Sequence, residues 1–167
     1  MSDNQRRRLT PEDRRAQLIA LGVLFLADRP LDELTMEELS ERAGVSRALV
    51  FHYFGSRQGL HRAVVAVARD SLLVASEPRP ELPALERLRD TLLRIVMFVR
   101  EHRGTFFSLV RGVASGDSEV RAVVDESRVE NTRRLTEVFV ELGEPDGPRL
   151  RVALRSWVAF RSEERRV

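Results

Sequence analysis

The chain contains no cysteine and no lysine, and only one tryptophan and one tyrosine among its 167 residues. The lack of cysteine excludes disulfides, thiolate metal ligands and cysteine nucleophiles. No apolar run approaches the roughly 20 residues that a membrane-spanning helix needs. The N-terminal segment MSDNQRRRLTPEDRR has no apolar stretch after its arginines, so it does not resemble a secretory signal. We therefore expect a cytoplasmic protein with no membrane partner.

The charged residues are nearly balanced. All 28 basic side chains are arginines, and they face 26 acids for a net charge of +2. The pI of about 10.2 is high because no lysine titrates before arginine does. Bulk charge therefore does not indicate a nucleic-acid partner, and function must be inferred from where particular residues stand.

Helical periodicity runs along the chain without strand-like alternation, which predicts an all-α fold. We expect helices over 11–27, 35–43, 46–53, 56–75, 83–101, 104–115, 118–142 and 147–164. Three prolines fall within the eight residues SEPRPELP (76–83), a composition typical of a boundary between modules. This boundary predicts an N-terminal domain of residues 11–71 and a second helical domain of residues 77–167.

The segment TMEELSERAGVSRALVFHYFGSR contains the start and stop signals of two short helices. Thr35 and Glu38 form a capping box, in which each side chain is expected to bond the backbone N–H of the other. Gly44 suits a left-handed position after the first helix, and Ser46 suits the cap of the second. Two helices joined by a short turn with glycine predict a helix-turn-helix over about 34–53.

In a helix-turn-helix the second helix enters the major groove with its N-terminal residues first. Arg47 suits a bidentate bond to guanine, and the Ala48 methyl suits contact with a thymine methyl. Phosphate contacts are expected from the helix starts at Thr35 and Ser46 and from the donors of His52, Tyr53 and Arg57. The segment therefore predicts binding to double-stranded DNA.

From about residue 12 to 66 the chain resembles the DNA-binding domain of the TetR family of transcriptional regulators. The resemblance rests on LIALGVLF (18–25), on TMEELSERAGVSRALVFHYFGSRQGL (35–60) and on their spacing. It places Arg47, Ala48 and Leu49 at the base-facing start of the recognition helix, Phe51, His52 and Tyr53 in its aromatic contact cluster, and Arg57 at a phosphate-binding position. It implies a second helical domain for effector binding and dimerisation. The implied function is a ligand-responsive repressor that binds a short inverted repeat as a homodimer.

The chain departs from the family pattern at several positions, and two of these departures remove a hydroxyl. Leu49 stands where family members usually have threonine, and Phe51 where they usually have tyrosine. Each loss removes a hydroxyl that can bond phosphate, worth about 1 kcal/mol. We therefore expect sequence preference to rest more heavily on Arg47 and on apolar contacts.

The second domain offers candidates for an effector pocket that binds a small molecule. They are Arg94, Met97, Phe98, Glu101, Phe106, Val110 and Trp157. A plain helical core with surface charges explains the same residues. In the first domain, likewise, Phe51 and Phe54 are alternatively core residues, and His52 an ordinary surface histidine.

An enzyme is not indicated. The three histidines have no metal-ligand spacing, and the chain has neither a glycine-rich phosphate loop nor a nucleophile elbow. We therefore expect no catalytic residue, no metal site and no cofactor. The alternative to a regulator is a helical protein-interaction module that has lost DNA binding.

The end of the chain carries one amphipathic helix where TetR-like proteins usually have two for dimerisation. Its apolar stripe consists of Leu150, Leu154, Trp157 and Phe160. We therefore expect the chain to be short at its C-terminus relative to the family, which weakens the expected homodimer.

Overall fold

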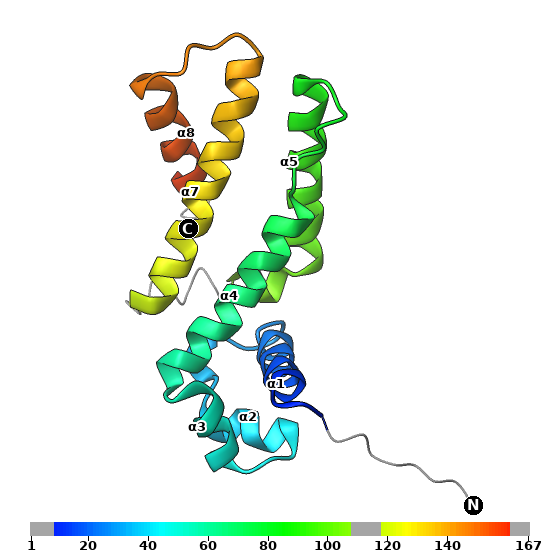
Figure 1. Cartoon of the computed structure of the whole chain (residues 1–167), viewed down its shortest axis with the longest axis vertical. Helices are drawn as coiled ribbons and strands as arrows, with labels where there is room; N and C mark the ends of the chain where they lie inside the picture. The colour runs from blue at the N-terminus through cyan, green and yellow to red at the C-terminus, as the bar shows by residue number, and fades with distance from the viewer. Residues whose placement is uncertain (1–8, 108–117, 161–167) are drawn as a thin grey trace, which may run out of the picture.

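The computed structural model describes residues 9–107 and 118–160, and within these ranges it contains helices and no strand. The helices are α1 (Pro11–Phe25), the 3-10 turn η1 (Leu31–Glu33), α2 (Met36–Ala43), α3 (Arg47–Phe54), α4 (Arg57–Ala75), α5 (Ala84–Glu101), α7 (Ser118–Glu141) and α8 (Pro148–Phe160). Residues 103–107 are also helical. The all-α prediction is confirmed (Figure 1).

Most predicted helix boundaries agree with the structure within one or two residues. The first helix ends at Phe25 and not at residue 27, because the N–H groups of residues 26–28 bond the carbonyls three residues back, those of residues 23–25, and the α-helical pattern gives way to a turn. The turn η1 was not predicted. The ranges predicted for two helices, 104–115 and 147–164, include residues that the structure does not describe, so their predicted ends are not tested.

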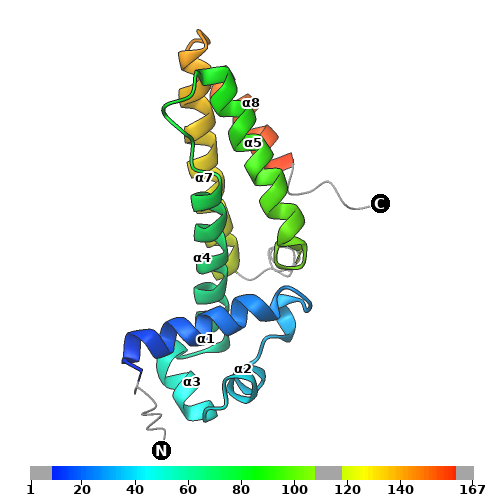
Figure 2. The ribbon, with the colours of Figure 1, turned by 90° about the vertical axis from the view of Figure 1, so that its right-hand side faces the viewer.

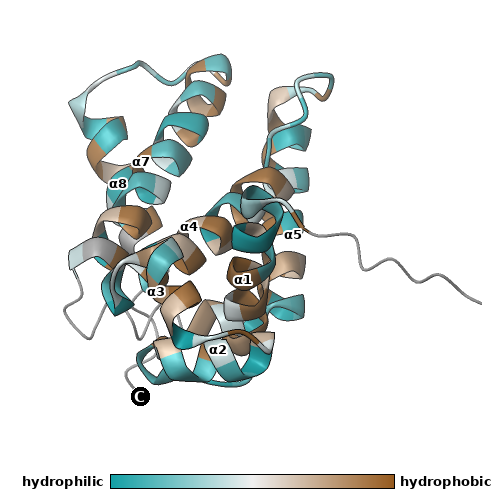
Figure 3. Ribbon diagram, turned by 60° about the horizontal axis from the view of Figure 1, so that its bottom comes forward, coloured by the Kyte–Doolittle hydropathy of each residue, from teal (hydrophilic) through white to brown (hydrophobic). Residues whose placement is uncertain are grey.

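The first three helices form a compact group around the first half of α4 (Figure 2). Their buried side chains pack into one cluster, which includes Leu18, Phe25, Leu39, Val50 and Leu60. Figure 3 shows hydrophobic segments of α1, α3 and α4 lying next to one another, with mostly hydrophilic residues along α2. Burial of this apolar surface holds the group together.

The second half of α4 leaves this group and packs against α5 and α7, while α8 packs on α7 (Figures 1 and 2). Val120 and Val123, near the start of α7, are buried in the same cluster as Leu18 and Leu60. Residues 76–83 form a non-helical linker as predicted, yet hydrophobic packing is continuous across it. The division into domains 11–71 and 77–167 stays a prediction.

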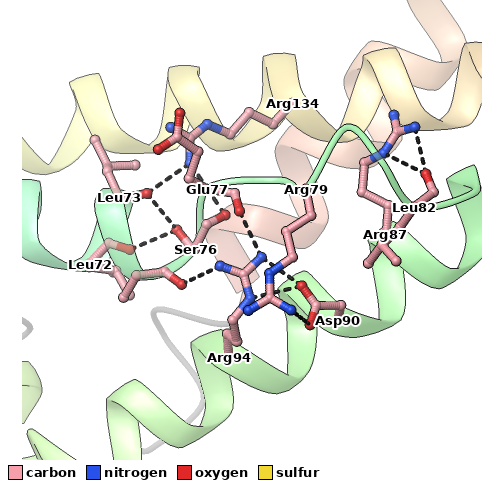
Figure 4. A network of polar contacts seen from close by, with 11 residues as sticks. Leu72, Leu73, Ser76, Glu77, Arg79, Leu82, Arg87, Asp90, Arg94 and Arg134 are labelled. Atoms are coloured by element: carbon pink, nitrogen blue, oxygen red, sulfur yellow. Dashed lines mark hydrogen bonds and ion pairs between the residues drawn. The ribbon is translucent and has the colours of Figure 1, made fainter.

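Two arginines join the C-terminus of α4 to its neighbours (Figure 4). Arg94 of α5 donates hydrogen bonds to the carbonyl oxygens of Ala75 and Glu77, each at 2.7 Å. Arg134 of α7 donates to the carbonyl of Leu73 at 3.0 Å. The last carbonyls of a helix have no partner within it, so these side chains satisfy them and fix α4 between α5 and α7.

Candidate nucleic-acid interface

The turn between α2 and α3 has the geometry that the sequence predicts. Gly44 ends α2 with φ 62° and ψ 36°, a left-handed conformation that favours glycine. The Ser46 hydroxyl accepts a hydrogen bond from the Leu49 N–H at 3.2 Å and so caps α3. The Thr35 hydroxyl accepts from the Glu38 N–H at 3.1 Å and caps α2. Together these features set where α2 begins and ends and where α3 begins.

Half of the predicted capping box is wrong. The Glu38 carboxylate does not serve the Thr35 N–H but forms ion pairs with Arg42 at 2.7 Å and Arg29 at 3.1 Å. Hydrogen bonding from Arg42, together with the charge of Arg29, lowers the pKa of Glu38. Two guanidiniums attract the carboxylate more strongly than a single backbone amide does.

The recognition helix α3 has one buried side and one exposed side. Val50 and Phe54 are buried in the core, so the interpretation of Phe54 as a core residue is confirmed. The Phe51 side chain is 55% exposed, which rules out a core role. The other exposed residues of α3 are Arg47, Ala48 and His52, whereas Leu49 and Tyr53 are half-buried. We call Arg47, Ala48, Phe51 and His52 the reading face.

Two arginines of the predicted site already have protein partners. Arg47 Nη1 lies 2.8 Å from Glu37 Oε1, at the start of α2. The Arg57 guanidinium donates to the carbonyl oxygen of Asp32 in η1. Neither contact has a periodic signature in the sequence, and both were missed by sequence reasoning.

The reading face lies at one end of the molecule. In Figures 1 and 2, α2 and α3 lie at the opposite end from the α7–α8 loop, with α4 between. The His52 and Tyr53 rings pack edge to face, with centroids 5.4 Å apart. The predicted DNA-contacting residues therefore share one end of the molecule, on α2, α3 and the first turn of α4.

The predicted effector residues are spread over α5, the 103–107 helix and α8. Arg94 donates to the carbonyl oxygens of Ala75 and Glu77, as described above, and its role of orienting a ligand stays a prediction. Phe98 stacks on His102 at 4.2 Å between centroids, and Phe106 is half-buried. Met97, Glu101 and Trp157 are exposed, and Val110 lies outside the described residues. The effector pocket stays a prediction.

A groove that the sequence did not predict lies between α1 and α4. Its volume is about 400 Å³, and its lining is Glu12, Arg15, Ala16, Ile19, Ala20 and Val67.

Among the described residues no group of three or more histidine or acidic side chains is arranged to hold a metal ion. None of the described helices combines the length and apolar character of a membrane span.

Two short helices joined by a glycine turn, the second of them exposed along one side, define a helix-turn-helix protein. A family model described as "Bacterial regulatory proteins, tetR family" matches residues 18–64. A second model, described as "Tetracyclin repressor-like, C-terminal domain", matches residues 84–161. The chain belongs to the TetR family of transcriptional regulators, as the resemblance predicted.

The relatives differ in the roles that their names state. A crystal structure of a TetR-family transcriptional regulator from Streptomyces coelicolor is 30% identical, with a TM-score of 0.76 over 95% of this chain and 74% of that one. The nucleoid occlusion factor SlmA of Haemophilus influenzae is 28% identical over 98 residues, 57% of this chain and 45% of that protein. The transcriptional activator FasR of Mycolicibacterium smegmatis is 30% identical over 105 residues, 62% of this chain and 48% of that protein. The chain thus spans less than half the length of these two curated relatives.

Proposed function

We propose that this protein is a sequence-specific DNA-binding transcriptional regulator that acts as a ligand-responsive repressor. The observation that carries the proposal is the division of α3, where Val50 and Phe54 anchor a helix whose reading face is open to solvent. A major groove about 12 Å wide admits a single helix held in this manner.

Base reading is assigned to the N-terminal turn of α3. Arg47 presents a forked set of N–H donors that matches the O6 and N7 acceptors of guanine. The Ala48 methyl is exposed beside it and suits the thymine C5 methyl. Phe51 extends the same face by one turn with apolar surface in place of a hydroxyl.

Phosphate contacts are assigned to the edges of this surface. The hydroxyls of Thr35 and Ser46 each satisfy one first-turn N–H, which leaves other first-turn donors of α2 and α3 for phosphate oxygens. Arg57 and His52 add exposed donors at the far end of α3. The bond from Arg57 to Asp32 holds this guanidinium at the start of α4.

Repression through a homodimer and a small effector is the finer part of the proposal. The match of residues 84–161 to a repressor-like C-terminal domain supports it, as does the exposure of Val152 and Trp157 on α8. Two recognition helices about 34 Å apart, one from each protomer, would fit an inverted repeat. The proposed location is the cytoplasm, where bacterial DNA lies. An effector releases DNA only if it binds the DNA-incompetent state more tightly.

The test begins with selection of bound duplexes from a random library. Arg47→Ala should weaken binding to the selected site by about 1–3 kcal/mol and relax the preference at one base pair. Arg57→Ala should weaken all sequences alike and lower the salt slope by about one. If both substitutions act equally on every duplex, base reading by Arg47 is wrong, and a chain that selects no sequence is a protein-interaction module instead. Sedimentation of the protein with and without its site measures the proposed dimer.

A further inference from the structure

The ion pair between Glu37 and Arg47 joins the two helices of the helix-turn-helix at its exposed edge. Glu37 is the second residue of α2, and Arg47 is the first residue of α3. Their side chains are 51% and 68% exposed, with 2.8 Å between Oε1 and Nη1. The carboxylate therefore lies beside the first residue of the reading face.

This ion pair is poorly placed to stabilise the fold. Pairs between exposed side chains are screened by water and salt and contribute little. The carboxylate also stands in the first turn of α2, where the proposed function places a phosphate and where a negative charge repels DNA. An acid in the first turn also interacts favourably with the helix dipole, but Glu38 supplies that interaction too, and the dipole does not require the contact with Arg47.

We infer that Glu37 is a positioning residue that sets the sequence preference of the protein through Arg47, an inference that rests on the proposed function. An arginine side chain has many rotamers, and holding it in one of them before binding lowers the entropy lost in the complex. The guanidinium has five N–H donors, so a contact through Nη1 leaves others for a base edge.

Glu37 also acts against DNA of the wrong sequence. Binding to arbitrary DNA depends mainly on phosphate charge, which the carboxylate repels in every sequence. Only a duplex with a guanine opposite Arg47 recovers this loss through the oriented guanidinium. Glu37 therefore raises the ratio of specific to non-specific affinity in two ways. It orients Arg47 for a guanine, and it weakens binding to DNA of other sequences.

The neighbouring acids of α2 provide a control. Glu38 is occupied by Arg29 and Arg42. Glu41 is exposed one turn beyond Glu37 on the same helix. Glu41→Gln therefore removes the same charge from the same helix without touching Arg47.

The experiment measures equilibrium binding of the full chain to its selected duplex and to a scrambled duplex, at several salt concentrations. Glu37→Gln should lower the affinity ratio between the two duplexes about tenfold, within the range of couplings between contacting residues. Glu41→Gln should change both affinities by the same factor and leave the ratio unchanged. In an Arg47→Ala background, Glu37→Gln should no longer alter the ratio.

A second variant separates charge from contact. Glu37→Asp keeps the repulsion of phosphate but is one methylene too short for the same contact, so it should lower the ratio without strengthening binding to the scrambled duplex. Thermal unfolding of each variant checks that the fold is kept.

Three outcomes decide the matter. If Glu37→Gln behaves like Glu41→Gln, the carboxylate only repels DNA and the inference is overturned. If Glu37→Gln raises the ratio, the carboxylate competes with DNA for Arg47, and the inference is overturned as well. If the unmodified chain does not distinguish the two duplexes, the proposed function itself has failed.

Discussion

A methyl group added at Gly104 tests how closely the 103–107 helix approaches the turn after α1. A Cβ built on Gly104 would lie 1.6 Å from the carbonyl oxygen of Ala27, 2.4 Å from its carbonyl carbon and 2.9 Å from its Cα. All three atoms are backbone, so no side-chain rotation relieves the overlap. Carbon–oxygen contacts are normally about 3.3–3.6 Å, so Gly104→Ala must separate the 103–107 helix from the turn after α1 by nearly 2 Å.

The expected loss of stability follows from this displacement. Overpacking typically costs about 1–3 kcal/mol, and a clash with backbone belongs at the upper end. A loss of about 3 kcal/mol in the free energy of unfolding corresponds to a melting temperature lower by roughly 6–12 °C in a chain of this length. Urea unfolding followed by circular dichroism measures both the midpoint and the slope.

The matched control is Gly147→Ala. A Cβ at Gly147 meets no heavy atom closer than the carbonyl oxygen of Pro145, at 4.0 Å. Gly147 is the N-cap of α8, a position where alanine is less favourable than glycine, so this substitution should cost no more than about 1 kcal/mol. If Gly104→Ala unfolds at the same urea concentration as Gly147→Ala, the close approach of Gly104 to Ala27 is refuted.

Two further predictions concern α7. Val120 is fully buried in the cluster shared with α1 and α4, so Val120→Ala should lower the free energy of unfolding by about 2 kcal/mol. Val129 is 69% exposed, so Val129→Ala should change the free energy of unfolding little. Equal urea midpoints for the two variants would contradict the shared core. Hydrogen bonds from Arg133 and Arg134 lower the pKa of Glu130 from 4.5 to about 2. A carboxyl whose pKa is lower in the folded state stabilises the fold above its unfolded value and loses that contribution as the pH falls from 4.5 towards 2. Glu130→Gln should therefore be less stable than the unmodified chain at pH 6 and approach it near pH 2, and a difference independent of pH would contradict this assignment.

The helix ends and the turn of the N-terminal domain were predictable because their signals are local. Gly44 and Ser46 specify the stop of α2 and the cap of α3 within a few residues of the chain, and the structure confirms both. The Ser56 hydroxyl likewise caps α4, accepting from the Gly59 N–H at 3.0 Å. Such contacts depend on side-chain type and short spacing alone.

The contacts between elements were not predictable from the sequence. Arg94 reaches Ala75 across 19 residues, and Arg57 reaches Asp32 across 25. No periodic pattern in the sequence indicates the partner of a long arginine side chain. The positions of Arg94 and Arg57 were therefore as compatible with a ligand or a phosphate as with a carbonyl group of the protein. The pair of Glu37 with Arg47 has the same origin, because its ten-residue spacing matches no helical repeat.

The spacing within α3 separates stability from recognition. Val50 and Phe54 are four residues apart on the buried side, so a polar substitution at either one exposes the core cluster to water. Arg47, Ala48 and Phe51 are exposed, and substitutions at exposed positions typically change stability by no more than about 0.5 kcal/mol. Sequence preference can therefore change through the reading face while the helix stays in place. This independence holds only while Val50 and Phe54 remain, because the same helix must be anchored before it can be inserted into a groove.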